Sequence, residues 1–221
     1  MLYKVSYVFL FFIVYSFLGW ICEIIFVSIK EKRLVKTRGF LLGPVCPIYG
    51  FGGLIMFLYL SKYKNDPVLL FTSSIMLFAI LEYFTSYAME KMFKARWWDY
   101  SNHKFNLNGR ITLNTLPLFG LLGLVVIYGL NPILNILLTK LSSNSVIIIA
   151  IVILVVFLID NIISFSVILK FKNTVNKTKD NTAEINEYVK ETLNKYLLSR
   201  RLINAFPNLK IIKYAKMKTK L

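Results

Sequence analysis

Long apolar runs separated by short basic segments dominate the chain. Five runs contain no Lys or Arg, and four of them are long enough to cross a hydrocarbon core of ~30 Å, which needs roughly 20 helical residues. The remaining run is shorter and rich in glycine. We therefore expect an all-α, polytopic membrane protein with five transmembrane helices, at residues 5–29, 43–60, 68–90, 111–138 and 146–169.

The pattern becomes polar at its C-terminal end, so we divide the chain into a transmembrane domain at 1–170 and a basic tail at 171–221. Within the tail, apolar residues recur at three- and four-residue steps between 183 and 201, which predicts an amphipathic helix. Residues 202–221 mix apolar side chains with lysines. This mixture indicates a segment that binds the membrane surface or a partner, with a solvated basic tail as the alternative.

Composition supports a membrane protein, because 57% of the 221 residues are hydrophobic, against roughly 45–50% in soluble domains. With five spans, four of the 27 Lys and Arg residues fall on one side of the membrane and 23 on the other. Since Lys and Arg stay on the cytoplasmic side, we expect a multi-pass protein of the bacterial cytoplasmic membrane, with its N-terminus outside and its C-terminus inside. The net charge of +16 therefore indicates topology and contact with anionic lipid, and it argues against nucleic-acid binding.

Two segments 70 residues apart are similar: RGFLLGPVCPIYGFGGL at 38–54 and NGRITLNTLPLFGLLGL at 108–124. Upstream, Glu23 and Glu82 each lie late in the preceding predicted helix. We interpret helices 1–2 and 3–4 as a parallel repeat about an axis along the membrane normal. Glycine and proline in these segments indicate close packing or irregular backbone, so 43–50 is either the start of a helix or a re-entrant element. The residues concerned are Gly39, Gly43, Pro44, Pro47, Gly50, Gly109, Pro117 and Gly120.

Charged side chains inside predicted spans point to a site, because a charge at mid-membrane costs at least ~2.5–3.5 kcal/mol. Three carboxylates lie in the cytoplasmic half of their spans, and arginines approach from the same side. Helix N-termini and arginines both favour anions. We expect a cytoplasm-facing polar pocket between the two repeats that binds an anionic solute or a lipid head group, while ion pairs that only tie helices together remain the alternative. The expected site residues are Glu23, Arg38, Glu82, Arg96, Trp98, Asp99, Arg110 and Asp160.

Several catalytic motifs are missing from the sequence. It contains no P-loop, no H-E-x-x-H, no paired cysteines and no G-x-S-x-G, so nothing indicates ATP hydrolysis, a zinc site or a serine nucleophile on this chain. We expect no metal and no cofactor, and a role other than that of an enzyme is favoured.

Four segments resemble a family of small bacterial membrane proteins catalogued as ABC-transporter type IV, or CmpB-like permeases: FLGWICEIIF, RGFLLGPVCPIYGFGGL, LEYFTSYAMEKMFKARWWDYSNHKFNLNGRITL and RRLINAFP. The resemblance implies transport, with an ATPase on another chain. Because five spans are few for a complete transporter, we expect a homodimer or a partner subunit, which the basic tail could bind. Two other functions stay open: an intramembrane enzyme acting on lipid head groups, and a non-catalytic membrane sensor or assembly factor.

Overall fold

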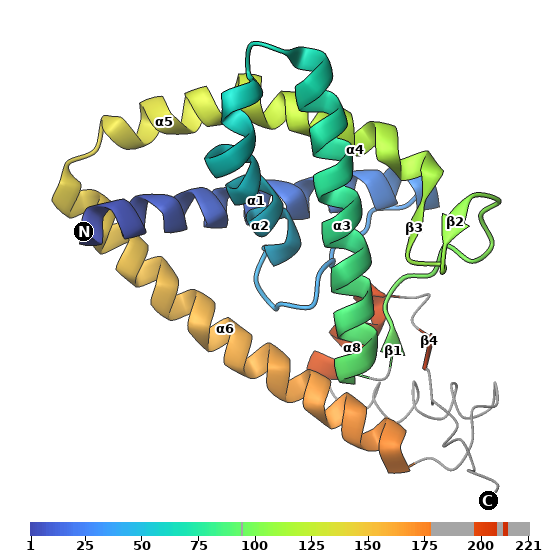
Figure 1. The fold of residues 1–221 in the computed structure, drawn as a ribbon. Helices are drawn as coiled ribbons and strands as arrows, with labels where there is room; N and C mark the ends of the chain where they lie inside the picture. The colour runs from blue at the N-terminus through green and yellow to red at the C-terminus, as the bar shows by residue number, and fades with distance from the viewer. Residues whose placement is uncertain (94, 178–196, 207–209, 212–221) are drawn as a thin grey trace, which may run out of the picture.

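The computed structural model describes residues 1–93, 95–177, 197–206 and 210–211 (Figure 1). Over these residues the chain is mostly helical. Four helical segments are long and apolar enough to cross a membrane, as a multi-pass membrane protein requires. They cover Leu2–Ile29, Pro67–Phe93, Leu113–Thr139 and Ser143–Leu169.

Three of these segments are uninterrupted α-helices: α1 at Leu2–Glu31, α3 at Pro67–Phe93 and α6 at Ser143–Lys177. α6 continues past the predicted end of its span at residue 169. The reason is local, because the following residues contain neither glycine nor proline, the two residues that end helices most readily. The first residues of the predicted basic tail, 171–177, are therefore helical.

The second predicted span is shorter in the structure. It consists of α2 at Pro47–Ile55, the π-helix η1 at Met56–Leu60 and the 3-10 turn η2 at Ser61–Tyr63. Residues 43–46 are not helical, because Pro47 occupies the first turn of α2, where a missing N–H is tolerated. The segment is not among the four that are long enough to span, so the fifth crossing stays a prediction.

The span predicted at 111–138 also begins later than expected. Asn108 and Gly109 have φ of +54° and +67°, which produces a tight turn between two short antiparallel strands. Helical structure follows only after the second strand. The elements in order are β2 at Asn106–Leu107, β3 at Ile111–Thr112, the 3-10 turn η3 at Leu113–Thr115, α4 at Leu116–Leu124, the π-helix η4 at Val125–Leu130 and α5 at Asn131–Thr139.

The helices pack in two pairs, α1 with α2 and α3 with α4. Glycine allows the close approach in both pairs. Phe12 of α1 occupies the space where Gly50 would carry a Cβ, and Phe71 of α3 does the same at Gly120. The two π-helices contact each other, which joins the pairs. The main apolar core lies here and contains Phe11, Tyr15, Met56, Leu70, Phe78, Val126, Ile127 and Leu134.

Two hydrogen bonds between polar side chains connect α1 to α5. The Tyr15 hydroxyl donates to the Asn131 side chain, and the Tyr7 hydroxyl donates to Asn135. Their spacing follows from helix geometry, because residues four or eight positions apart share one face. Tyr15 and Asn131 are both buried, so each satisfies a polar group that would be costly in an apolar interior.

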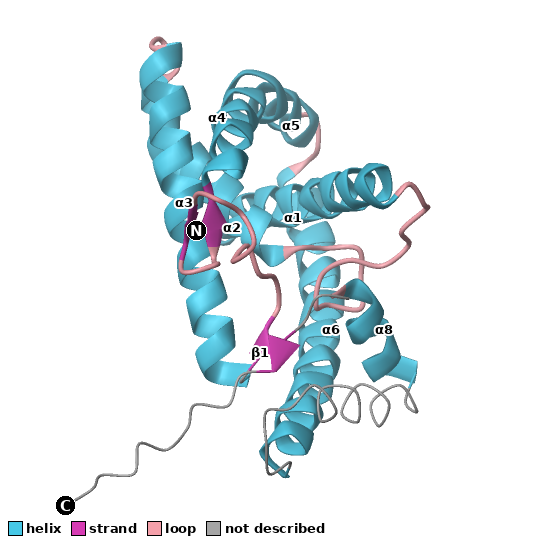
Figure 2. Ribbon diagram, turned by 90° about the vertical axis from the view of Figure 1, so that its right-hand side faces the viewer, coloured by secondary structure: helices cyan, strands magenta, loops and turns pink. Residues whose placement is uncertain are grey.

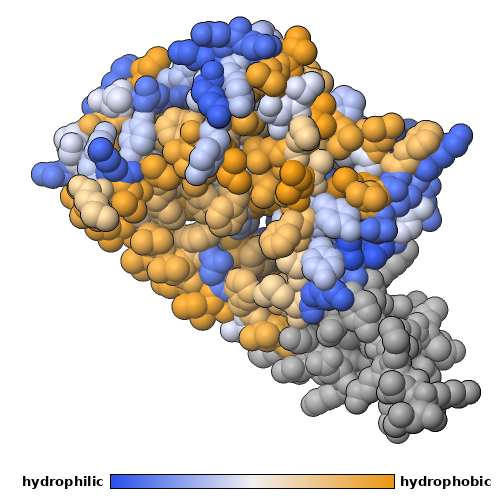
Figure 3. All heavy atoms as spheres, in the orientation of Figure 1, coloured by the Kyte–Doolittle hydropathy of each residue, from blue (hydrophilic) through white to orange (hydrophobic). Residues whose placement is uncertain are grey.

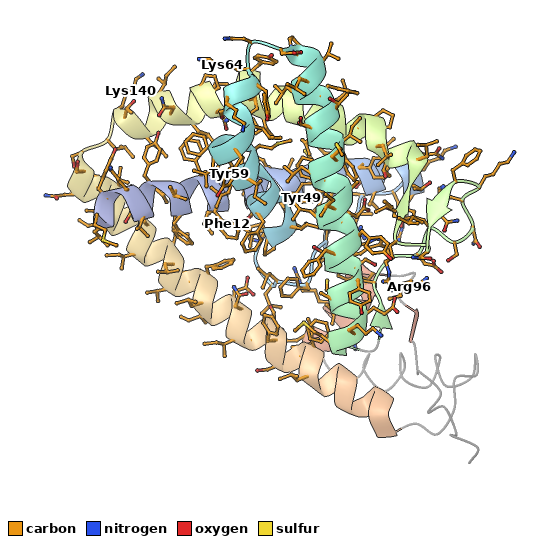
Figure 4. All side chains as sticks on the ribbon, in the orientation of Figure 1. Phe12, Tyr49, Tyr59, Lys64, Arg96 and Lys140 are labelled. Atoms are coloured by element: carbon orange, nitrogen blue, oxygen red, sulfur yellow. The ribbon has the colours of Figure 1, made fainter. Side chains whose placement is uncertain are left out.

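The outer surface is largely apolar, as a lipid-facing surface should be. Figure 3 shows apolar side chains over the middle of the visible face, with polar side chains gathered at its upper edge and on its right. α6 contributes much of this surface, with exposed side chains at Ile148, Val152, Val155, Val156, Ile159 and Ile162. Figure 4 places Lys64 and Lys140 together at one end of the molecule and Arg96 far from them.

The described part of the tail folds back onto the helices. α8 covers Leu197–Ala205 and lies beside α6 (Figure 2), and β4 at Lys210–Ile211 pairs antiparallel with β1 at Ala95–Arg96. A second apolar cluster forms around α8 from Phe93, Trp97, Val167, Ile168 and Leu202. The amphipathic helix predicted at 183–201 lies mostly outside the described residues, as does most of 202–221.

Candidate functional site

An ion pair with a tyrosine partner lies at the C-terminal end of α1. Arg38 donates to Glu23 Oε2 through Nη2 at 2.9 Å and through Nε at 3.3 Å, and the Tyr49 hydroxyl donates to Glu23 Oε1 at 2.6 Å. The side chains of Arg38 and Glu23 are 18% and 27% exposed. We call Glu23, Arg38 and Tyr49 the α1 cluster. Both carboxylate oxygens of Glu23 accept hydrogen bonds. The Glu23–Arg38 pair is nevertheless partly exposed and can be reached by small polar groups.

The tail reaches this cluster directly. Arg38 Nη1 donates to the backbone carbonyl of Ala205, at the end of α8, where the last carbonyls of a helix attract cations. The Arg38 guanidinium also lies 5.7 Å from the ring centroid of Phe206. Phe206 in turn meets Trp97 edge-on at 4.9 Å. Arg38 therefore connects α1 to the tail.

A second cluster lies at the C-terminal end of α3. Glu90 Oε2 accepts from Arg110 Nη1 at 2.8 Å and from Arg96 Nε at 3.1 Å. Arg110 also donates to the Ser86 hydroxyl at 3.3 Å, and its guanidinium lies over the rings of Tyr83 and Tyr87. Arg110 and Glu90 are 6% and 3% exposed, so this pair is buried, whereas the side chain of Arg96 is 18% exposed.

The loop after α3 completes the second cluster. Asp99 Oδ1 accepts from Arg96 Nη1 at 3.4 Å and from the Ser101 hydroxyl at 2.5 Å, and Trp98 Nε1 donates to the Arg110 carbonyl at 3.1 Å. Two features require glycine at position 109. Its φ of +67° lies in the left-handed region, and an added Cβ would lie 2.6 Å from Asp99 Oδ1. We call Glu90, Arg96, Asp99 and Arg110 the α3 cluster.

Glu82 lies in the second half of α3, as Glu23 does in α1, but it has no arginine partner among the described residues. Its Oε1 accepts from the Tyr100 hydroxyl at 3.2 Å, and its buried Oε2 has no hydrogen bond within the described part of the chain. Burial first, and then the Glu82 charge, raise the pKa of Tyr100 well above its usual range. Weaker effects on the same pKa come from Glu23, which raises it, and from Arg38, which lowers it, so Tyr100 lies within electrostatic reach of both acids.

Asp160 has no arginine partner in the part of the chain that the structure describes, and it holds the loop before α2. Its Oδ1 and Oδ2 accept from the backbone N–H groups of Leu42 and Gly43, both at 2.8 Å, and the Ser164 hydroxyl donates to Oδ1 at 2.9 Å. A Cβ at Gly43 would lie 2.9 Å from Asp160 Oδ2. Asp160 therefore holds the backbone of the Gly-Pro segment, and a binding role for it stays a prediction.

The expected site residues did not include Glu90, Tyr49 or Tyr100. A signal for Glu90 was present, because Glu82, Ser86 and Glu90 recur every four residues and so share one face of α3. Glu90 fell at the predicted end of the span, where a charge needs no explanation. The tyrosines had no such signal, since their contacts with Glu23 and Glu82 depend on how distant segments meet.

The eight predicted site residues thus fall into four arrangements: the Glu23–Arg38 pair, the Arg96–Asp99–Arg110 group with Trp98, the Glu82–Tyr100 pair and the Asp160 cap. A hollow in the structure lies elsewhere, lined by Tyr3, Lys4, Tyr7, Val8, Phe57 and Thr139. Tyr3 is 20 residues from Glu23 along one helix, or about 30 Å. Among the described residues, no group of three or more His, Cys, Asp or Glu side chains could hold a metal ion.

Comparison with known proteins gives one match. A family model with the description "Putative ABC-transporter type IV" matches residues 10–165, a range that contains both clusters, Glu82, Tyr100 and Asp160. No curated protein and no solved structure matches the chain.

Proposed function

We propose a function from one premise: the chain belongs to the ABC-transporter type IV family, whose model covers most of its length. As a multi-pass membrane protein of this family, it acts as a permease-like transporter component. It binds an anionic solute or a lipid head group in the polar layer between the α1–α2 pair and the α3–α4 pair. This layer contains the α1 cluster together with Glu82 and Tyr100.

One observation carries the proposal. Tyr100 hydrogen-bonds Glu82, and its pKa responds to burial, to Glu82, to Glu23 and to Arg38. Acidic, basic and hydroxyl groups from both helix pairs therefore converge within electrostatic reach of one side chain. Such ionisable groups at membrane depth are expensive and typically mark a substrate path. The α3 cluster, whose Glu90–Arg110 pair is buried, then forms a rigid boundary of this layer.

An internal duplication supports placing the site between the pairs. Contacts in the first pair recur in the second at offsets of 59 residues in the first helix and 70 in the second. Gly50 meets Phe12 as Gly120 meets Phe71, and Gly53 meets Tyr15 as Gly123 meets Ser74. The Gly19–Tyr49 contact corresponds to the Phe78–Phe119 ring pair. In transporters built from repeats, substrate sites lie where the repeats meet.

Orientation follows from the basic loops. We place the loops at 32–46 and 95–112, together with α8, in the cytoplasm, and the turns that carry Lys64 and Lys140 outside, because Lys and Arg are retained on the cytoplasmic side. The site then faces the cytoplasm. ATP hydrolysis is assigned to a separate subunit, since this chain has no P-loop.

Binding by the full-length protein tests the proposal. The detergent-solubilised protein is titrated with inorganic phosphate, glycerol 3-phosphate and citrate, and the same protein in nanodiscs with increasing phosphatidylglycerol. We expect saturable binding of at least one probe, weakened at least about tenfold in Arg38→Ala, because charge-assisted contacts to arginine are strong. Tyr100→Phe keeps every charge and should weaken binding by a smaller factor.

Lys64→Ala is the matched control, because it removes one positive charge at the opposite end of the molecule. Circular dichroism and gel filtration verify that each variant is folded. Absence of saturable binding for every probe, or an equal loss in Lys64→Ala and Arg38→Ala, would reject the proposed site.

A further inference from the structure

The tail helix α8 is packed as part of the protein core. Leu202 and Ala205 are 3% and 0% exposed, and Leu202 belongs to the apolar cluster of Trp97, Val167 and Ile168. The Ala205 carbonyl accepts from Arg38. These contacts fix the orientation of α8 against the α1 cluster, so a polar side chain on its inner face has a defined position.

Arg201 lies on this helix and is half-buried. The arginines of the two clusters all have acidic partners: Glu23 for Arg38, and Glu90 for Arg96 and Arg110. Arg201 makes neither an ion pair nor a side-chain hydrogen bond with any residue that the structure describes. A partly buried guanidinium without an acidic partner is costly, and this cost calls for a reason.

The acid with the largest electrostatic effect on Arg201 already has hydrogen-bond partners. Burial lowers the pKa of the Arg201 guanidinium, and the charge of Asp160 raises it in turn. Asp160, however, accepts from Leu42 N, Gly43 N and the Ser164 hydroxyl, which uses most of its acceptor capacity. Arg201 therefore supplies positive charge and free donors beside the Gly-Pro segment at 39–46.

We propose that Arg201 binds the phosphate group of the ligand. The tail helix α8, packed against the α1 cluster, would then form part of the proposed binding site in addition to any role in binding a partner subunit. A guanidinium suits this role because its planar donors match phosphate oxygens in pairs. The ligand is accordingly a phosphate ester, either a soluble one or a phospholipid head group. This inference rests on the proposed function and specifies the substrate class of the same site.

The test compares two neighbouring arginines of α8. Arg201→Ala and Arg200→Ala remove the same charge from the same helix, but Arg200 is exposed. Full-length variants are titrated with inorganic phosphate and glycerol 3-phosphate in detergent, and with phosphatidylglycerol in nanodiscs. We expect Arg201→Ala to weaken binding at least about tenfold, Arg201→Lys to weaken it less because the charge remains, and Arg200→Ala to change it less than about twofold.

The two titrations identify the source of the phosphate group: dependence of the glycerol 3-phosphate affinity on Arg201 indicates a soluble ester, and dependence only in nanodiscs indicates a lipid. Equal losses in Arg201→Ala and Arg200→Ala would overturn the inference. A loss of affinity in Tyr100→Phe together with wild-type affinity in Arg201→Ala would also overturn the inference. That outcome would leave the proposed function standing. A wild-type protein that binds no probe rejects both. A lower thermal midpoint with unchanged affinity in Arg201→Ala would assign Arg201 to balancing Asp160 and would also overturn the inference.

Discussion

The α1 cluster and the α3 cluster use the same chemistry but differ in their contact with solvent. In the α3 cluster the side chains of Arg110 and Glu90 are 8% and 4% exposed, whereas those of Arg38 and Glu23 in the α1 cluster are 18% and 27% exposed. Arg96 of the α3 cluster is as exposed as Arg38, at 18%, so the difference lies in the acids and in Arg110. The buried Glu90 carboxylate accepts from two arginines and so holds elements together, whereas the half-open Glu23–Arg38 pair can exchange partners with a ligand.

The largest difference should appear when each acid is neutralised. Glu90→Gln leaves Arg96 and Arg110 without their shared carboxylate in a buried setting, and removal of one partner from such a pair costs about 3–5 kcal/mol. Glu23→Gln leaves Arg38 with its Ala205 contact and access to water, so we expect less than half that loss. Unfolding of both variants in detergent by SDS titration measures the two values. Equal losses would remove the distinction between the clusters.

A smaller difference should appear at the loop glycines that precede each cluster's second helix. Gly109→Ala introduces a Cβ against Asp99 and Arg96 at φ +67°, whereas Gly39→Ala at φ +77° meets only the Cys46 sulfur at 3.0 Å and the Val45 carbonyl at 3.5 Å. Both carry backbone strain of about 1–3 kcal/mol, and steric overlap adds to it at Gly109. The thermal midpoint should therefore fall further in Gly109→Ala, and the reverse order would contradict the assignment of a rigid α3 cluster.

The smallest effects are expected from the tyrosine hydroxyls. Tyr49→Phe removes a 2.6 Å bond to Glu23 and Tyr100→Phe a 3.2 Å bond to Glu82. Hydrogen bonds to charged groups contribute about 1.5–3 kcal/mol, so Tyr49→Phe should lie near the lower end of that range and Tyr100→Phe below it. Side-by-side unfolding curves check the order. A larger loss in Tyr100→Phe would show that Glu82, rather than Glu23, is the more tightly held acid.

The membrane architecture was predictable because apolar runs without Lys or Arg have few other uses. α1, α3 and α6 lie where those runs are. The π-helices were not predictable, since Met56–Leu60 and Val125–Leu130 contain ordinary apolar residues and their geometry depends on the contact between them. The late start of α4 depends on the Asn108–Gly109 turn, which pairs β3 at Ile111–Thr112 with β2. Composition alone did not separate these strand residues from the apolar run that follows them.

The candidate site was predictable in its residue types and less so in its partners. Buried charge demands a counter-charge, which is why arginines near Glu23 were expected. That argument does not say which acid meets which arginine: Arg110 meets Glu90, and Glu82 meets a tyrosine instead. The contribution of α8 was not predictable either, because its position results from an apolar cluster built from segments more than 100 residues apart.

The π-helix η4 also determines which way the side chains of the following helix, α5, point. A π-segment carries surplus chain compared with an α-helix of equal height. Deleting one residue from Val125–Leu130 would let α4 and α5 merge into one α-helix and would turn α5 by about 100°. Asn131 and Asn135 would then rotate away from Tyr15 and Tyr7 toward the acyl chains. The deletion of one residue, which would hardly change the hydropathy of the segment, would thus break both hydrogen bonds between α1 and α5.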